Sequence, residues 1–336
     1  MDNGIAIAGN MLVDYVKLIP SLPAAGMLAS ILSVDRAVGG SVPNTLLDLA
    51  AMGGDIPLTA IGLMGKDEAG DYVQSTLEKA GIDTRLVQRT RETATSFSDA
   101  MCARDTGERT FFHFRGANAR FSPEHIPLDR IHARILHIGY LLLLDRFDAE
   151  DPEYGTVMAR FLHDAQAAGF LTSIDVVSDS EGRFAQVVKP ALKYCDYVIV
   201  NEIEACAVWG LSPRNENGSV SEENIRAALT LFKQSGVKRR AVVHCPEAGY
   251  CLDEDGMFTK VSSLRLPDGY IKGSVGAGDA FCAGCLRAIY RGKDAAEMLT
   301  LAAAAAAANL SAADSVSGMK DEAALYRLDA LYRKAQ

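Results

Sequence analysis

The stretch that decides the fold lies late in the chain: Gly273-Ser274-Val275-Gly276-Ala277-Gly278-Asp279-Ala280-Phe281-Cys282-Ala283-Gly284. Its glycines allow backbone conformations that other residues avoid, so several backbone N–H groups can point at one spot. A helix-forming run follows, and the N-terminus of a helix carries partial positive charge. The stretch therefore predicts an anion site with a carboxylate, that of Asp279, beside it.

This stretch does not match either of two common phosphate-binding motifs. The spacing from Gly273 to Gly278 fits the start of a Walker A loop, but Asp279 and Ala280 stand where that loop needs Lys followed by Ser or Thr. A dinucleotide-binding fingerprint would need a third glycine at Phe281. A carboxylate beside a phosphate site is unfavourable unless it has a task of its own, such as accepting the proton of an attacking hydroxyl. The alternative is a helix N-cap, for which Asp is a favoured residue.

The composition is that of an ordinary globular chain. Its 336 residues, 49% of them hydrophobic, can bury a large core. There are 34 basic and 43 acidic residues, and no basic run is longer than 238–240, which argues against nucleic acid as the main partner. Residues 1–4 lead straight into an apolar strand, so we expect no signal peptide, and the apolar run 299–310 is too short to cross a membrane.

The seven cysteines have no framework spacing, as expected for reduced thiols in a cytoplasm. Cys282 and Cys285 form a CxxC pair, but neither a second CxxC nor a nearby pair of histidines accompanies them in the sequence. They lie one helical turn apart, and we expect them to pack in the core and not to bind a metal.

The second half of the chain alternates between short apolar runs and helical stretches. The apolar runs are residues 135–140, 171–176, 197–200 and 241–244. Helical stretches such as 156–168 and 221–235 separate them. This alternation predicts an α/β fold with a parallel sheet covered by helices on both faces. Ligands of such sheets bind beyond the carboxyl ends of the strands.

The first half contains signals for a smaller sheet. Residues 96–102 and 110–114 alternate around a turn at 105–108, which predicts a β-hairpin. Residues 15–36 mix prolines, a glycine and two short apolar runs, 16–20 and 28–34, which is compatible with a pair of edge strands.

The segment Gly276-Ala277-Gly278-Asp279-Ala280-Phe281, followed by Gly284, resembles the signature of the PfkB, or ribokinase-like, carbohydrate kinases. Gly39-Gly40-x-x-x-Asn44 is similar to the family's first signature. The resemblance covers nearly the whole chain. It implies a single kinase domain over 1–336, a three-layer α/β/α sandwich with a mostly parallel central sheet. It also implies a small β-sheet lid formed by about 12–36 and 94–116.

The resemblance also implies site residues. As catalytic groups it implies the Asp279 carboxylate as base and an anion hole at Gly276, Ala277 and Gly278. As acceptor-binding residues it implies Asp14, Gly39, Gly40, Asn44, Arg115 and Asn118. As ATP-binding residues it implies Asn201, Gly249, Ser274, Gly276, Gly278 and Asn309.

Asn201 and Glu204 resemble the family's Asn-x-x-Glu motif for magnesium and phosphate, and hard oxygen ligands suit that ion. The alternative is an N-cap Asn with an acid in the first helical turn. Two loops depart from the family pattern. Residues 244–249 keep only the final glycine of a nucleotide-binding loop. Gly273 replaces an acid that helps to hold a monovalent cation in some relatives, so potassium activation is not assumed.

These observations predict a magnesium-dependent kinase that transfers the γ-phosphoryl group of ATP to a sugar hydroxyl, of the ribokinase or fructokinase type. The alternatives are a nucleoside kinase of the adenosine type, or a non-catalytic sugar sensor of the same fold. A kinase of phosphorylated sugars would need basic residues at the far end of the acceptor; the candidates are Arg104, Arg115 and Arg120. We further expect a cytoplasmic homodimer that pairs through the lid, with neither a nucleic-acid nor a membrane partner.

Overall fold

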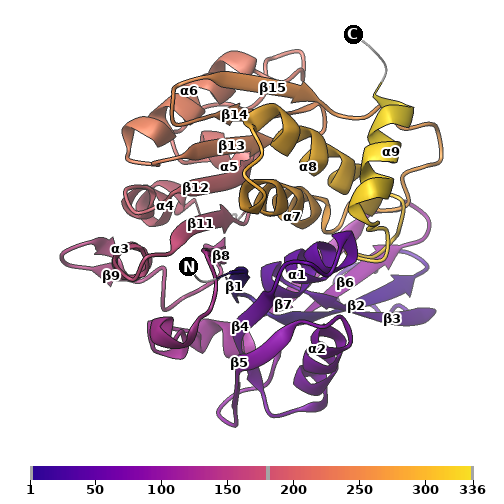
Figure 1. Ribbon diagram of the computed structural model, residues 1–336. Coiled ribbons are helices and arrows are strands. Elements are labelled where there is room, and N and C mark those ends of the chain that lie inside the picture. The colour runs from indigo at the N-terminus through magenta and orange to yellow at the C-terminus, as the bar shows by residue number, and fades with distance from the viewer. Residues whose placement is uncertain (1–2, 179–181, 334–336) are drawn as a thin grey trace.

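A nine-stranded sheet forms the centre of the protein in the computed structural model, which describes residues 3–178 and 182–333 (Figure 1). Residues 1 and 2, part of the segment assessed for a signal peptide, lie outside this range. The strand order is β15-β14-β13-β12-β11-β8-β1-β4-β5. The parallel strands are β1 (Ile5–Gly9), β4 (Leu58–Gly65), β5 (Asp83–Thr90), β8 (Ile135–Leu141), β11 (Leu171–Val176), β12 (Tyr197–Asn201) and β13 (Arg240–His244). Two antiparallel strands, β14 (Ala248–Leu252) and β15 (Phe258–Ser262), complete one edge.

Helices cover both faces of this sheet, as the alternation of strand and helix predicted. One layer contains α1 (Ser41–Met52), α2 (Glu68–Lys79), α7 (Ala277–Tyr290), α8 (Ala295–Asn309) and α9 (Glu322–Tyr332). The other contains α3 (Val157–Ala167), α4 (Phe184–Leu192), α5 (Glu202–Ala207) and α6 (Glu222–Gln234). Strand β1 shows why its sequence is apolar throughout: Ile5 and Ile7 enter the core on one face, while Ala6 and Ala8 enter the core on the other. The predicted three-layer fold is confirmed.

A second sheet of four strands stands beside this core, in the order β3-β2-β6-β7. Its strands are β2 (Leu12–Ile19), β3 (Ser33–Gly39), β6 (Ser96–Ala103) and β7 (Arg109–Phe114). Strand β2 pairs in parallel with β6 and antiparallel with β3, and β6 and β7 form an antiparallel hairpin. Since β2 begins just after β1 ends and β3 leads into α1, the small sheet lies at the carboxyl edge of the large one.

The two strands expected within residues 15–36 are present, but with other bounds. Strand β3 begins only at Ser33, so most of the apolar run 28–34 lies outside it, and only β3 is an edge strand, because β2 lies between β3 and β6. Leu28 is 89% exposed and Ile31 and Leu32 are also exposed, so no packed surface stabilises an extended conformation there.

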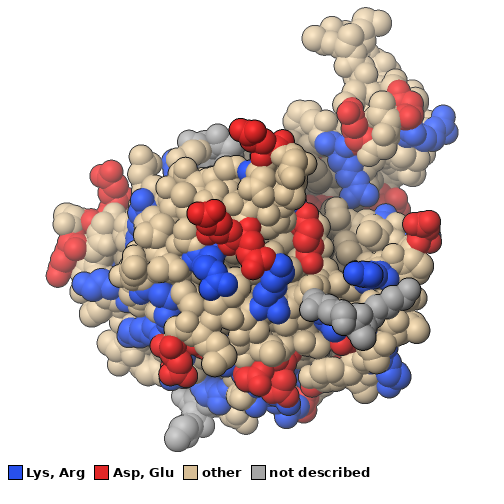
Figure 2. Space-filling model, turned by 90° about the horizontal axis from the view of Figure 1, so that it is seen from above, with Lys and Arg blue, Asp and Glu red and all other residues tan. Residues whose placement is uncertain are grey.

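Short elements complete the chain. They are the 3₁₀ turns η1 (Gly116–Arg120), η2 (Pro123–His125) and η3 (Leu128–Arg130), and the two-stranded β9 (Glu150–Asp151) with β10 (Gly155–Thr156). Within the described ranges no helix is both long and apolar enough to span a bilayer. On the face of the molecule in Figure 2, acidic and basic side chains lie next to one another instead of forming a field of one sign.

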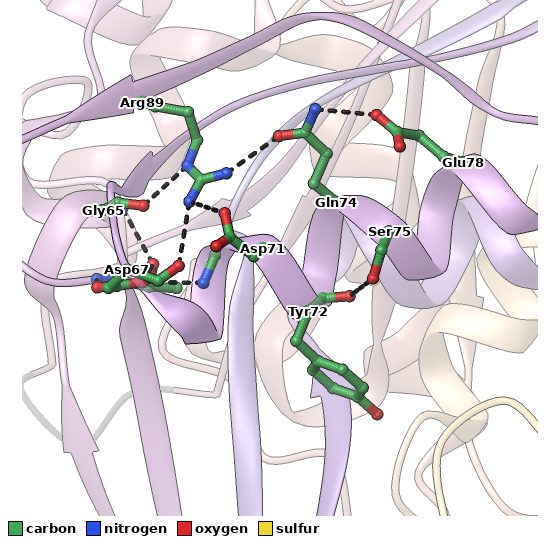
Figure 3. A network of polar contacts seen from close by, with 10 residues as sticks. Gly65, Asp67, Asp71, Tyr72, Gln74, Ser75, Glu78 and Arg89 are labelled. Atoms are coloured by element: carbon green, nitrogen blue, oxygen red, sulfur yellow. Dashed lines mark hydrogen bonds and ion pairs between the residues drawn. The ribbon is translucent and has the colours of Figure 1, made fainter.

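Arg89 at the end of β5 fastens helix α2 to the large sheet (Figure 3). Its guanidinium donates to the backbone oxygens of Gly65 (2.8 Å) and Asp67 (3.1 Å). It also donates to the side chains of Asp71 (2.7 Å) and Gln74 (3.1 Å) on the first turns of α2. One side chain therefore fixes the turn between β4 and α2.

Asp67 connects the same turn to the small sheet. One carboxylate oxygen caps α2 by accepting from the N–H of Gly70 (2.9 Å). The carboxylate also accepts from the backbone N–H and the hydroxyl of Thr95, at 2.7 and 2.6 Å, directly before β6 begins. The position of the four-stranded sheet relative to the core thus depends in part on this residue.

Candidate active site

The first turn of α7 brings backbone N–H groups and one carboxylate together. Gly276 precedes the helix with a φ of 79°, and a Cβ at this position would lie 2.6 Å from the backbone oxygen of Ser315. The first N–H groups of a helix have no acceptor within it. That of Ala277 makes a long bond, 3.4 Å, to the backbone oxygen of Ser274. Asp279 lies in the first turn and is buried, at 6% exposure.

Two side chains hold the Asp279 carboxylate in place. The Asn44 amide donates to Oδ2 (2.9 Å), and the Tyr140 hydroxyl lies 2.7 Å from Oδ1 and 2.8 Å from Oδ2. Burial, and after it the nearby charge of Asp175, raise the pKa of Asp279 to about 7, although the hydrogen bonds from Asn44 and Tyr140 oppose this rise. A carboxylate with a pKa near neutrality, held in one orientation, is suited to accept a proton.

Asp279 faces a cavity of about 540 Å³ beyond the carboxyl ends of β11, β12 and β13. This is where a parallel sheet is expected to bind ligands. Residues from several predicted groups line it together: Asn201, Glu204, Ser274, Gly276, Gly278 and Asp279. Ala277 adjoins them as the first residue of α7. The structure thus gathers the predicted base, the glycine loop and the predicted metal ligands around one space.

Asn201 and Glu204 form a capping box at the start of α5. The Asn201 side chain accepts from the N–H of Glu204 (2.8 Å), and the Glu204 carboxylate accepts from the N–H of Asn201 (3.0 Å). Burial raises the pKa of Glu204 to about 8; hydrogen bonds from Asn201 and Ser178 oppose this rise, and the nearby charges of Asp175 and Glu202 add to it. A carboxylate and an amide oxygen at the wall of a cavity fit a magnesium ion, which prefers hard oxygen ligands and keeps several waters.

A second cavity, also of about 540 Å³, lies under the four-stranded sheet and contains Asp14. Phe111 of β7 lines both cavities, so the two spaces are neighbours. Gly39 lies against the Asp14 side chain, since a Cβ on Gly39 would come within 2.1 Å of Oδ2. Burial raises the pKa of Asp14 to about 6, and a hydrogen bond with Ser98 opposes that rise.

The other residues predicted to bind the acceptor have structural partners. Gly40 precedes α1 with a φ of 90°, and a Cβ there would lie 2.6 Å from the Asn10 carbonyl oxygen. Asn118 is fully buried, and its side-chain oxygen accepts from the backbone N–H of Met11 (3.1 Å). Arg115 forms an ion pair with Asp145 (2.5 Å).

Two residues predicted to bind ATP lie outside the walls of both cavities. Gly249 in β14 packs against α7 and α8, since a Cβ there would lie 3.0 Å from the ring of Phe281 and 3.1 Å from Leu299. Asn309 is buried at the end of α8, where its amide donates to the Ser315 carbonyl oxygen (2.6 Å).

Sequence reasoning missed three residues near Asp279. Tyr140 donates to its carboxylate, but it stood in the sequence as the last residue of an apolar strand. His244 stacks on Phe281 (4.7 Å between ring centroids), and burial lowers its pKa to about 4, so a neutral imidazole lines the cavity. Asp48 is fully buried on α1. The available signal was an acid four residues after Asn44 in an otherwise apolar helical run.

Comparison with known protein families shows which class of protein this chain belongs to. The model of the family described as "pfkB family carbohydrate kinase" matches residues 3–321, so the chain belongs to this family. It is accordingly a phosphotransferase that uses an alcohol group as acceptor.

Individual relatives show how distant the similarity is. A ribokinase of Arabidopsis thaliana is 24% identical over 328 residues, which cover 96% of this chain and 80% of the relative. An adenosine kinase of Schizosaccharomyces pombe is 24% identical over 250 residues, covering 71% of this chain and 69% of the relative. The solved structure of Arabidopsis thaliana ribokinase complexed with ribose and ATP superposes with a TM-score of 0.79 at 20% identity, over 98% of this chain and 99% of that one. The fold is therefore ribokinase-like.

Proposed function

We propose that this protein transfers the γ-phosphoryl group of ATP to a hydroxyl of a sugar, with Asp279 as the general base. The observation that carries the proposal is the position of Asp279. Its carboxylate is held by Asn44 and Tyr140 at the start of α7 and faces a cavity that the glycine loop and Glu204 also line. ATP as donor is supported by the solved ribokinase of the same fold, which is complexed with ribose and ATP.

The chemistry follows from these groups. The acceptor oxygen forms a bond to the γ-phosphorus while the bond to the β,γ-bridging oxygen breaks, and the acceptor proton passes to the carboxylate of Asp279. Backbone N–H groups around Gly276, Ala277 and Gly278 stabilise the negative charge on the transferred group. Glu204 and Asn201 would hold magnesium, which neutralises charge on the ATP phosphates when it is bound.

The acceptor is assigned to the space between the two cavities. Asp14, in the wall of the second cavity, would accept hydrogen bonds from sugar hydroxyls. The four-stranded sheet, which covers this space through Phe111, would act as the lid of the domain and exclude water, the competing acceptor.

Replacement of the base tests the proposal. We expect Asp279→Asn to lower turnover at least about a hundredfold, because general-base catalysis contributes that much or more. ATP and sugar should still bind within a few-fold of wild type. Asp268→Asn, the same change at an exposed position, is the matched control and should leave turnover unchanged. Turnover near the wild-type rate in Asp279→Asn would show that this carboxylate is not the base.

A nucleoside kinase is the second candidate, and the similarity to an adenosine kinase favours it. ATP turnover measured with pentoses, hexoses, keto-acid sugars, nucleosides and sugar phosphates separates the two activities. A sensor of the same fold would bind one of these ligands without consuming ATP.

We also propose that two copies of the chain associate through the four-stranded sheet. Strands β3 and β7 are its open edges. The sheet and the loop before β3 expose large apolar side chains, and such patches typically mark interaction surfaces. These side chains are Met27, Leu28, Ile31, Leu32, Val34, Phe112 and Phe114.

A further inference from the structure

Three potential metal ligands lie close together near Asp279. They are His137 of β8, Asp175 of β11 and Cys282 of α7, and their ligand atoms all lie within 4.8 Å of one another. His137 Nε2 is 3.6 Å from Asp175 Oδ2 and 3.8 Å from Cys282 Sγ. All three residues are buried. Because three separate elements supply them, the grouping is a product of the tertiary fold.

The separations in this cluster are also those expected around a shared ion. The 3.8 Å contact between Cys282 Sγ and His137 Nε2 is within the longer hydrogen-bond distance that sulfur allows, whereas the contact of His137 with Asp175 is not. A nitrogen and an oxygen 3.6 Å apart are beyond hydrogen-bond distance. Zinc binds nitrogen and oxygen at about 2.0–2.2 Å and sulfur at about 2.3 Å in tetrahedral geometry, which places neighbouring ligand atoms roughly 3.3–3.7 Å apart. The contacts of His137 with Asp175 and Cys282 therefore need only small shifts to become edges of such a tetrahedron.

The surroundings of the three side chains also point to a missing partner. Ser173 Oγ is 2.9 Å from His137 Nδ1, which leaves Nε2 directed at the cluster, the arrangement in which a second residue orients a metal-binding histidine. Asp175 Oδ1 and Ser41 Oγ are both buried without a hydrogen-bond partner in the described part of the chain. The two atoms are close neighbours, since a Cβ on Gly139 would lie 2.1 Å from the first and 2.5 Å from the second.

An ion can reach this position from the solvent side. Asp175 and Cys282 both line the cavity that contains Asp279, so the cluster forms part of its wall. Three protein ligands leave one position of a tetrahedron for a water molecule or for Ser41.

We propose that His137, Asp175 and Cys282 bind one zinc ion, at a site separate from the oxygen-only pair Asn201 and Glu204. Donor chemistry distinguishes the two sites: imidazole and thiolate select zinc, whereas carboxylate and amide oxygens suit magnesium. Burial raises the pKa of the Cys282 thiol well above its usual range, so without an ion the sulfur keeps its proton. Formation of the zinc–sulfur bond releases this proton to solvent, and no electrons are transferred.

The test measures metal binding directly and needs neither ATP nor sugar, so its outcome is independent of the proposed kinase activity. The full chain is stripped with a chelator and dialysed against zinc in excess magnesium, and bound metal is measured by elemental analysis. We expect one zinc per chain. Cobalt in place of zinc should give the charge-transfer absorption of a thiolate ligand.

The chain offers a matched pair of variants. Cys282 and Cys285 are both buried on α7, one turn apart, but only Cys282 belongs to the cluster. Cys282→Ser should weaken zinc binding at least about tenfold and remove the cobalt band, since even residues that only orient a ligand contribute about that much. Cys285→Ser should keep both properties.

Asp175→Asn is a second variant that removes a proposed zinc ligand and keeps both cysteines, in case Cys282→Ser does not fold. It should also weaken binding, with a cobalt band that is reduced or absent. The proposal is overturned if wild-type protein retains less than one zinc per chain at saturation. It is equally overturned if Cys282→Ser and Cys285→Ser bind alike, or if the folded Asp175→Asn variant binds as wild type does.

Discussion

Tyr140 lowers the pKa of Asp279, the residue proposed as the general base. Asp279 accepts a proton only when it is ionised, and burial places its pKa at about 7, so kcat/KM should fall as the pH drops below about 7. The Tyr140 hydroxyl stabilises the ionised form. Tyr140→Phe should therefore raise the pKa of Asp279 and move the midpoint of this fall to higher pH, by up to about one unit.

The measurement is the dependence of kcat/KM on pH for both proteins. Tyr154→Phe removes a tyrosine hydroxyl elsewhere, near His163, and should leave the midpoint unchanged. A midpoint of Tyr140→Phe that stays in place, or that moves to lower pH, would contradict the assignment of Tyr140 as a donor to the ionised base.

Asp48 presents the opposite case, a buried carboxyl without a donor. It is fully buried, and neither oxygen has a hydrogen-bond partner among the described residues. Burial raises its pKa well above the usual range, and the nearby charges of Asp279 and Asp314 add to that rise. The folded state therefore favours the neutral carboxyl. The neutral Asp48 carboxyl contributes its full stabilisation to the folded state below the unfolded pKa of Asp, about 3.9. This stabilisation is lost as the pH rises from there toward the higher folded pKa.

Asp48→Asn tests this sign. Asn has nearly the same shape and is neutral at every pH, so the variant should gain stability relative to wild type as the pH rises. Over the affected range the difference in free energy of unfolding should grow by up to about 1.4 kcal/mol per pH unit. Urea denaturation of both proteins at about pH 5 and about pH 8 measures it. A difference that does not change with pH would show that Asp48 does not titrate abnormally.

At the scale of elements, Asp67 carries two connections in one side chain. It caps α2 through Gly70 and binds Thr95 at the start of β6. Burial alone would raise its pKa, but the hydrogen bonds from Thr95 and Gly70 and the charge of Arg89 outweigh it and lower the pKa. The stabilisation is thus present above the unfolded pKa and is lost as the pH falls.

We expect Asp67→Ala to cost about 2 kcal/mol in free energy of unfolding at neutral pH, the upper end for loss of a cap, because the bonds to Thr95 are lost as well. Asp321→Ala is the comparison. Asp321 caps α9 through the N–H of Ala324 and should cost about 1 kcal/mol. If the two variants lose the same stability in denaturant unfolding, the bonds to Thr95 contribute nothing to it.

Sequence patterns that extend over only a few residues correctly predicted the strands of the large sheet and the start of α7. The apolar run of β12 and the glycine before α7 act over a few residues, so the sequence alone revealed the parallel sheet and the helix start. The run 28–34 placed the second strand of the small sheet too early in the sequence, because Leu28, Ile31 and Leu32 are exposed and β3 begins only at Ser33. An apolar run reports that burial is possible but does not identify the surface that would cover it.

The candidate site was predictable only where one segment supplies it. Glycines and an acid adjacent in sequence revealed the start of α7. The partners of Asp279 could not be found in this way, because Tyr140 is separated from it by 139 positions and Asn44 by 235. The cluster of His137, Asp175 and Cys282 likewise exists only after β8, β11 and α7 have packed. The CxxC spacing of Cys282 and Cys285 drew attention to a pair that the fold does not use together.

At the scale of the whole molecule, the four-stranded sheet has two different faces. Phe111 lines both cavities, and side chains alternate along a strand, so its neighbour Phe112 points to the opposite face, where it is 58% exposed. Phe114 shares that outer face and packs its ring against Phe97 of β6 (5.3 Å between centroids). An apolar outer face on a sheet with open edges is unfavourable in water unless something covers it.

If a second copy covers this face, the chain of 36.0 kDa should behave in solution as a particle of twice that mass. Phe112→Asp places a charge on the outer face and should shift the protein to the monomer, because burying an unpaired charge in an interface is strongly unfavourable. Met257→Asp is the matched control. Met257 is 64% exposed between β14 and β15, away from the four-stranded sheet, and its replacement should leave the dimer intact. Analytical ultracentrifugation at micromolar concentration decides the matter: a wild-type monomer, or equal dissociation of both variants, would remove the four-stranded sheet as the dimer interface.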